Sequence, residues 1–121
     1  FIRDALAGGP IIITGDGRPL RSYLYPTDLL IALWALLAKG TPGAAYNVGS
    51  EEPIALVDAA HRVASAVGAG VSVEVRGTPG TGAPPRYIPD TGRIRRELGV
   101  GQQVALESAI ARTIAWHRGA P

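Results

Sequence analysis

Apolar positions recur along the chain in two periods, one typical of strands and the other of helices. Residues 10–14 carry three isoleucines in a row, and residues 20–25 alternate apolar and polar positions. Both patterns predict strands. Between them stands Gly15-Asp16-Gly17, where glycine accepts the positive φ that a tight reversal needs. The pattern therefore predicts a hairpin within residues 10–25.

Apolar residues at helical spacing predict helices at residues 1–8, 27–39, 54–67, 92–98 and 104–118. The helix at 27–39 differs from the others, because its apolar residues lie on nearly every side. We expect such a helix to be packed on more than one side. Thr27 or Asp28 is expected to cap its N-terminus, and Asp28 is interpreted as a helix-start carboxylate in preference to a catalytic one.

Two further strands and one long loop complete the expected order. Residues 45–48 predict a short buried strand, and residues 71–75 alternate as a strand does. Residues 77–85, GTPGTGAPP, form a loop rich in glycine and proline, and long loops often carry function. We therefore predict an α/β fold with several helices and short strands, in one domain over residues 1–121.

Composition excludes several classes of protein. The chain has no cysteine, which rules out disulfides and thiolate chemistry, and two histidines cannot build a metal site on their own. The net charge of +2 comes almost entirely from arginine, so we do not expect nucleic-acid binding. The longest nearly apolar run is too short to span a bilayer, and no signal-peptide pattern is present, so a cytoplasmic protein is expected.

Several catalytic motifs are absent from the sequence. Neither glycine-rich stretch continues as the G-x-G-x-x-G turn of a dinucleotide fold. Lys39 follows no phosphate-binding loop, and Ala35 stands four residues before it, where a Tyr-x-x-x-Lys pair needs tyrosine. Since the chain also contains no methionine and opens like the end of a helix, we expect a fragment of a longer protein.

Arginine supplies the most plausible ligand chemistry. Arg21 lies just past the glycine turn, where its guanidinium can fork onto an anionic, phosphate-bearing ligand. The alternative for Arg21 is a solvated strand arginine, and the alternative for Arg86 is a surface ion pair. Asn47 can bind a neighbouring loop or a ligand.

Five segments resemble one family in the order of that family. The run from Gly15 to Asp28, GDGRPLRSYLYPTD, resembles a segment of the extended short-chain dehydrogenases, which include NAD-dependent nucleotide-sugar epimerases, dehydratases and decarboxylases. The other four matches are YNVG at 46–49, the run from Arg86 to Asp90, RRELG at 95–99 and the run from Thr113 to Trp116. Together they span nearly the whole chain.

This resemblance implies the C-terminal, substrate-binding part of such an enzyme, with the Rossmann core absent. A missing N-terminal part would bind NAD and carry the Tyr/Lys catalytic pair. Arg21 and Arg86 would hold the diphosphate of a nucleotide sugar. Asn47 would be a further substrate contact, while Ile12 to Thr14 would line the base pocket. The parent enzyme is expected to be a homodimer.

One position departs from the family pattern, and two other functions stay open. Pro19 stands where many relatives have glutamine, which implies the loss of one polar contact to the nucleotide. The first alternative is a non-catalytic α/β module that binds a nucleotide or a phosphorylated ligand. The second is a basic module for acidic partners, which the glutamates among the arginines disfavour.

Overall fold

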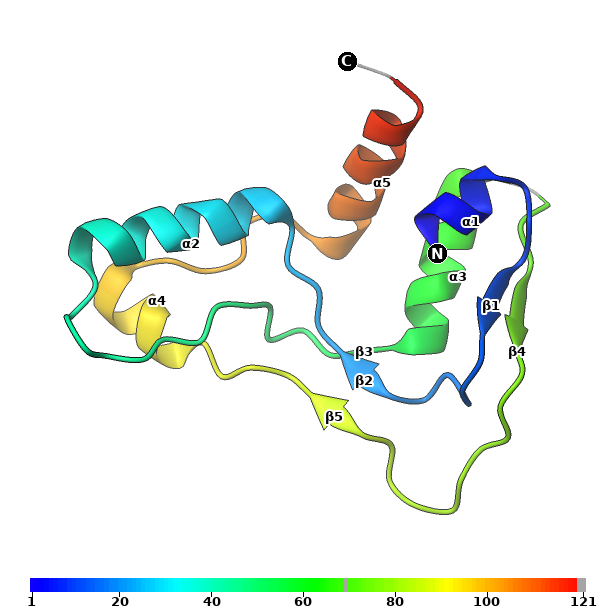
Figure 1. Ribbon diagram of the computed structural model, residues 1–121, viewed down its shortest axis with the longest axis horizontal. Helices are drawn as coiled ribbons and strands as arrows, with labels where there is room; N and C mark the ends of the chain where they lie inside the picture. Colours follow the sequence, from blue (N-terminus) through cyan, green and yellow to red (C-terminus); the bar gives the residue numbers. More distant parts are fainter. Residues whose placement is uncertain (69, 120–121) are drawn as a thin grey trace.

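The isoleucine run forms strand β1 (Ile11–Ile13), whose partner comes from far along the chain. β1 pairs in parallel with β4 (Val73–Val75), and Ile11 lies opposite Val73. The computed structural model describes residues 1–68 and 70–119. Figure 1 shows these two strands side by side at one end of the molecule, next to α1 (Ile2–Leu6) and α3 (Leu56–Val67).

The main hydrophobic core lies between β1 and three helices. β1 buries Ile11 and Ile13 and turns Ile12 outward, as the side-chain alternation of a strand requires. Besides α1 and α3, the third of these helices is α5 (Leu106–His117), which supplies Ile110 and Ile114 to the same cluster. The buried residues of this core are Ala5, Ile11, Ile13, Ala60, Val63, Ala64, Ile110 and Ile114.

A second small sheet lies in the middle of the molecule. Its central strand is β2 (Leu20–Arg21), which pairs antiparallel with β3 (Ile54–Ala55) and parallel with β5 (Arg86–Tyr87). The expected hairpin is therefore wrong, because β1 and β2 belong to different sheets. Gly17 has a φ of +73°, as expected, but the turn passes the chain from one sheet to the other.

At the far end, α2 (Pro26–Lys39) packs on the short helix α4 (Gly92–Leu98), as Figure 1 shows. α2 begins one residue earlier than expected, with Tyr25 as the N-cap and Pro26 in the first turn, where proline needs no hydrogen-bond donor. Neither Thr27 nor Asp28 is the cap. Only Asp28 and Ala32 of α2 are buried, so the expected packing on several sides is not present within the described residues.

Residues 45–48 do not form the strand that the sequence predicts. Within residues 1–68 and 70–119, no backbone group of 45–48 bonds to another backbone group, so no ladder exists there. The helices and the strands β1, β2 and β4 lie within a few residues of their expected positions, whereas the two-residue strands β3 and β5 were not expected from the sequence. In the described part of the chain, no helix has both the length and the apolarity to cross a membrane.

Candidate functional site

The glycine turn ties down the long loop at 77–85 through Arg18. The Nε atom of Arg18 donates to Asp16 Oδ2 at 2.8 Å, and its Nη2 atom donates to the carbonyl of Gly80 at 2.7 Å. The Arg18 side chain, as hydrogen-bond donor, is the main reason why the pKa of Asp16 is lowered. These contacts hold the loop in place just before it enters β5.

Arg21 is half-buried at the edge of an open cavity of about 390 Å³. Its Nη1 atom donates to the carbonyl of Leu20 at 2.9 Å, which fixes one end of the guanidinium. No carboxylate among the described residues forms an ion pair with Arg21. Its positive charge is therefore available to an anion in the cavity.

Arg86 lies on the strand next to Arg21, but the register separates the two side chains. Leu20 is opposite Arg86, and Arg21 is opposite Tyr87. Successive side chains of a strand point to opposite faces, so Arg86 shares a face with Leu20 and not with Arg21. Arg86 is exposed and does not line the cavity, so the structure does not bring the two arginines together there.

Tyr87 takes the place at the cavity that the sequence interpretation gave to Arg86. Tyr87 shares the face of Arg21, lines the same cavity and is 78% exposed. The sequence interpretation missed it, because the choice between neighbouring residues depends on the strand register. An exposed aromatic ring beside a free guanidinium offers a flat surface for an organic ligand.

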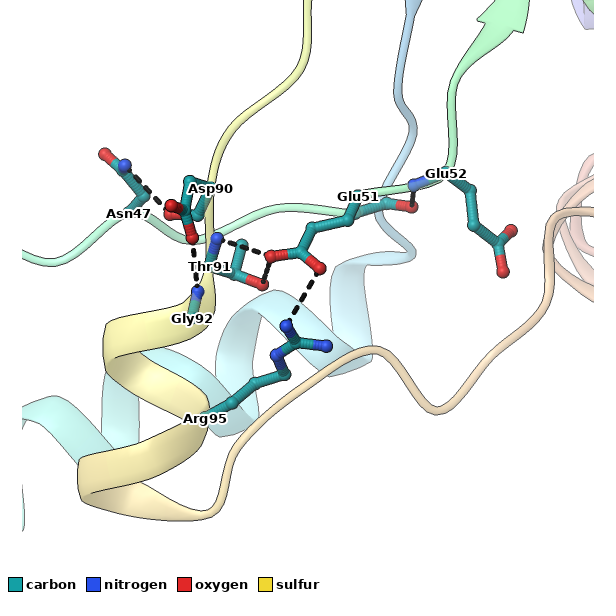
Figure 2. Close-up of polar contacts among 8 residues, drawn as sticks. Asn47, Glu51, Glu52, Asp90, Thr91, Gly92 and Arg95 are labelled. Atoms are coloured by element: carbon teal, nitrogen blue, oxygen red, sulfur yellow. Dashed lines mark hydrogen bonds and ion pairs between the residues drawn. The ribbon is translucent and has the colours of Figure 1, made fainter.

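Asn47 lines the same cavity and also binds a neighbouring segment. Its position is therefore compatible with a contact to a neighbouring loop and with a contact to a ligand. Its Nδ2 atom donates to the carbonyl of Asp90 at 3.0 Å, as Figure 2 shows, while its side-chain oxygen has no protein partner among the described residues. Asp90 in turn accepts a hydrogen bond from the backbone of Gly92 at 2.8 Å, at the start of α4. Asn47 is thereby held in one orientation at the cavity.

A carboxylate network beside Asn47 fixes this segment against α4 (Figure 2). Glu51 Oε1 accepts hydrogen bonds from the backbone nitrogen and the hydroxyl of Thr91 at 2.8 and 2.9 Å. Glu51 Oε2 lies 3.0 Å from Nη2 of Arg95. Donation from Thr91, backbone first, lowers the pKa of Glu51, and Arg95 adds a smaller effect.

Ile12 and Thr14 lie away from this cavity. Both belong to the β1 region, in the other sheet, and neither lines the cavity of Arg21 and Asn47. Ile12 is 39% exposed, on the side of β1 that faces away from the core. The structure therefore brings together two of the five expected residues, Arg21 and Asn47.

A larger hollow of about 500 Å³ lies nearby, but its lining does not suit an anion. Glu51 and Glu52 both line it, and Arg95 there is already paired with Glu51. Carboxylates repel a phosphate group, so the cavity at Arg21 is the better anion site. Across the described residues, no three His, Asp or Glu side chains are grouped so that they could hold a metal ion.

Comparisons with known proteins agree with the fold. The model of the NAD dependent epimerase/dehydratase family matches residues 1–49. A probable dTDP-glucose 4,6-dehydratase of Sinorhizobium fredii is 31% identical over 127 aligned positions, which cover 97% of this chain and 35% of that protein.

Two solved structures resemble the chain over 98% of its length. The enzyme WbmF of Bordetella bronchiseptica, in complex with NAD+ and UDP, has a TM-score of 0.82 and 28% identity, and the chain covers 34% of it. DesIV of Streptomyces venezuelae, a dTDP-glucose 4,6-dehydratase with NAD and TYD bound, has a TM-score of 0.81 and 28% identity, with 37% covered.

The small α/β fold and these matches define part of an extended short-chain dehydrogenase. The match of residues 1–49 to the NAD dependent epimerase/dehydratase family and the relatives along the whole chain support a fragment of such an enzyme. It spans about a third of the length of the relatives named above.

Proposed function

We propose that this chain is the C-terminal, nucleotide-sugar-binding domain of an NAD-dependent epimerase/dehydratase, and that Arg21 binds the diphosphate. The observation that carries the proposal is the position of Arg21, half-buried and without an ion-pair partner among the described residues, at a cavity shared with Asn47 and Tyr87. A guanidinium offers phosphate oxygens two parallel, charge-assisted hydrogen bonds.

The ligands of the similar structures support a nucleoside diphosphate. WbmF was solved with NAD+ and UDP, and DesIV was solved with NAD and TYD. In our proposal the diphosphate lies at Arg21 and the base or sugar contacts Tyr87 and Asn47. NAD and the catalytic pair belong to the part of the enzyme outside this chain, and holding the diphosphate positions the sugar for reaction there.

The parent protein in this proposal is a cytoplasmic homodimeric enzyme that acts on a nucleotide sugar. The relatives support this activity: the Sinorhizobium protein is a probable dTDP-glucose 4,6-dehydratase, and DesIV is a dTDP-glucose 4,6-dehydratase. Ile12 and Thr14 are proposed to reach the base only if the ligand extends beyond the cavity along the outer side of β1. Arg86 is proposed to lie outside the diphosphate site, because it shares the face of Leu20 and does not line the cavity.

Titration of UDP and dTDP into the isolated chain tests the role of Arg21. Arg21→Ala should weaken binding about tenfold, because a lost charge-assisted hydrogen bond costs roughly 1.5 kcal/mol. Arg86→Ala is the matched control, since Arg86 lies on the neighbouring strand and its side chain lies on the opposite face of the sheet from that of Arg21. We expect its affinity to stay within about threefold of the wild type.

Equal affinity of Arg21→Ala and the wild type would remove Arg21 from the site. An equal, large loss in both variants would favour the sequence-based hypothesis that the two arginines hold one diphosphate together. Isothermal titration calorimetry measures the affinities, and circular dichroism checks that each variant is folded.

A further inference from the structure

Arg18 is the main link between the middle of the loop at 77–85 and the rest of the chain. Its Nη2 atom donates to the carbonyls of Gly80 and Gly82, at 2.7 and 3.3 Å. In the described part of the chain, no other hydrogen bond reaches the loop between its two end residues. Residues 78–83 are exposed, so hydrophobic packing does not hold them. The position of this loop, which Figure 1 shows as a wide bend from β4 to β5, therefore depends on one side chain.

The segment that carries Arg18 is itself firmly held. The carbonyls of the residues on either side of it accept hydrogen bonds from the amides of Leu56 and Val57, at 3.1 and 3.0 Å. Asp16 orients the guanidinium, because its Oδ2 atom accepts a hydrogen bond from Nε of Arg18 at 2.8 Å. The loop contains three glycines, whose backbone has more conformations to lose than that of other residues. Arg18 therefore connects a fixed segment to a loop that does not hold its own shape.

The loop leads directly into β5, whose register decides which side chain lies beside Arg21. β2 and β5 pair over only two residues each, so the ladder by itself specifies the register weakly. The loop ends in two prolines, which have no N–H to donate, and one backbone bond, from the amide of Leu20 to the carbonyl of Pro85 at 2.8 Å, joins its end to β2. A slip of one residue would replace Tyr87 by Arg86 on the face of Arg21.

We infer that Arg18 is a positioning residue of the ligand site. By holding the middle of the loop, it fixes the length of chain that is available before β5 and so keeps Tyr87 beside Arg21. The inference rests on the proposed function, because it concerns the cavity in which Arg21 binds the diphosphate. Arg18 itself does not line that cavity. It acts on the ligand only through the register of β5, which sets the fraction of molecules that are competent to bind.

Titration of UDP into the variants Arg18→Ala and Arg76→Ala tests the positioning role. Each substitution removes one positive charge, but the Arg76 side chain bonds to Glu74 of the adjacent strand β4, at 3.4 Å, and not to the glycine turn. We expect the affinity of Arg18→Ala to fall about fivefold or more, and that of Arg76→Ala to stay within about twofold of the wild type. An equal loss in both variants would assign the effect to net charge and overturn the proposal.

The variant Asp16→Ala separates positioning from electrostatics by the sign of its effect. The substitution removes a negative charge, so charge alone would strengthen the binding of an anion. It also removes the group that orients the guanidinium of Arg18, so the positioning role predicts that UDP binds about threefold more weakly. Unchanged or tighter binding of UDP by Asp16→Ala would overturn the proposal.

Amide hydrogen exchange measures the pairing of β5 without a ligand. The amide of Leu20 bonds to Pro85 on the β5 side of β2, and the amide of Leu56 bonds to Pro19 on the β3 side. In Arg18→Ala we expect the Leu20 amide to exchange about tenfold faster than in the wild type, while the Leu56 amide stays within about threefold. This difference would show that the fold is kept and that β5 alone is released.

The positioning role and the proposed function can fail separately. Wild-type UDP affinity in Arg21→Ala would overturn the proposed function, whatever the exchange of the Leu20 amide. Unchanged protection of that amide in Arg18→Ala would overturn the positioning role. Wild-type UDP affinity in Arg18→Ala, together with a loss in Arg21→Ala, would also overturn the positioning role and would leave the proposed function intact.

Discussion

Asp28 shows how one buried carboxylate can join segments that are distant in sequence. It is 3% exposed, and its Oδ2 atom accepts hydrogen bonds from the backbone nitrogens of Gln103 and Val104, each at 2.9 Å. These contacts fix the connection between α4 and α5 against the first turn of α2. Asp28 therefore has a structural role, but across the chain and not at its own helix terminus.

Replacement of Asp28 by alanine should destabilise the protein strongly. Two backbone donors would lose the buried, charged acceptor that they share, and we expect a loss of about 3 kcal/mol in the free energy of unfolding. Asp58→Ala is the control, because Asp58 also lies in the first turn of a helix but is exposed. Its effect in urea unfolding should stay below about 0.5 kcal/mol. Similar losses in both variants would show that the contacts of Asp28 contribute little.

At the scale of elements, the glycine turn and the 77–85 loop meet through backbone atoms. A Cβ atom on Gly77 would lie 2.4 Å from the carbonyl carbon of Gly15. The amide of Gly77 also donates to the carbonyl of Gly15 at 3.1 Å. A side chain at position 77 would therefore push the two segments apart, and with them the entry of the loop into β5.

Gly77→Ala is expected to lower the free energy of unfolding by about 2 kcal/mol, because the backbone of Gly15 cannot move aside without loss of contacts. Gly82→Ala is the matched control in the same loop, since a Cβ atom there meets no other atom within 4 Å. We expect the control to unfold as the wild type does. If both variants are equally stable in urea, the close approach at Gly15 is not a constraint.

At the scale of the whole molecule, three carboxylates have lowered pKa values, and two of them, Glu51 and Glu97, join segments that are distant in sequence. The pKa of Asp16 is lowered chiefly by the Arg18 side chain, and the pKa of Glu51 by the backbone of Thr91. The pKa of Glu97 is lowered first by the hydroxyl of Tyr46 and then by Arg93. In each case the folded state favours the ionised carboxylate, so acid should weaken the fold.

The acid dependence of stability should be reduced in Glu51→Gln. A carboxyl with a lowered pKa stabilises the folded state above its ordinary value of 4.5 and loses that contribution as the pH falls through its lower, folded-state value. We expect the variant to lose less stability than the wild type between about pH 6 and about pH 3, measured by urea unfolding. Glu52→Gln is the control, since the Glu52 carboxylate makes no hydrogen bond among the described residues; it should retain the wild-type slope. An unchanged slope in Glu51→Gln would contradict the linkage.

The sequence by itself determined most helices, the strand β1, the α/β class and the family resemblance. Local propensity and periodicity set these features, because each depends on residues within one turn or one strand. The types of residue at the site were also visible, since an arginine after a glycine turn and an asparagine in an extended segment are local patterns.

Only the tertiary structure decided which strands pair and which side chains share a cavity. β1 pairs with β4 and β2 with β5 across long separations, and a shift of one residue in that register exchanges Arg86 for Tyr87 beside Arg21. The burial of Asp28 and the open face of α2 likewise depend on which elements pack together. Pairing and packing are contacts between distant segments, and no local pattern of residues specifies them.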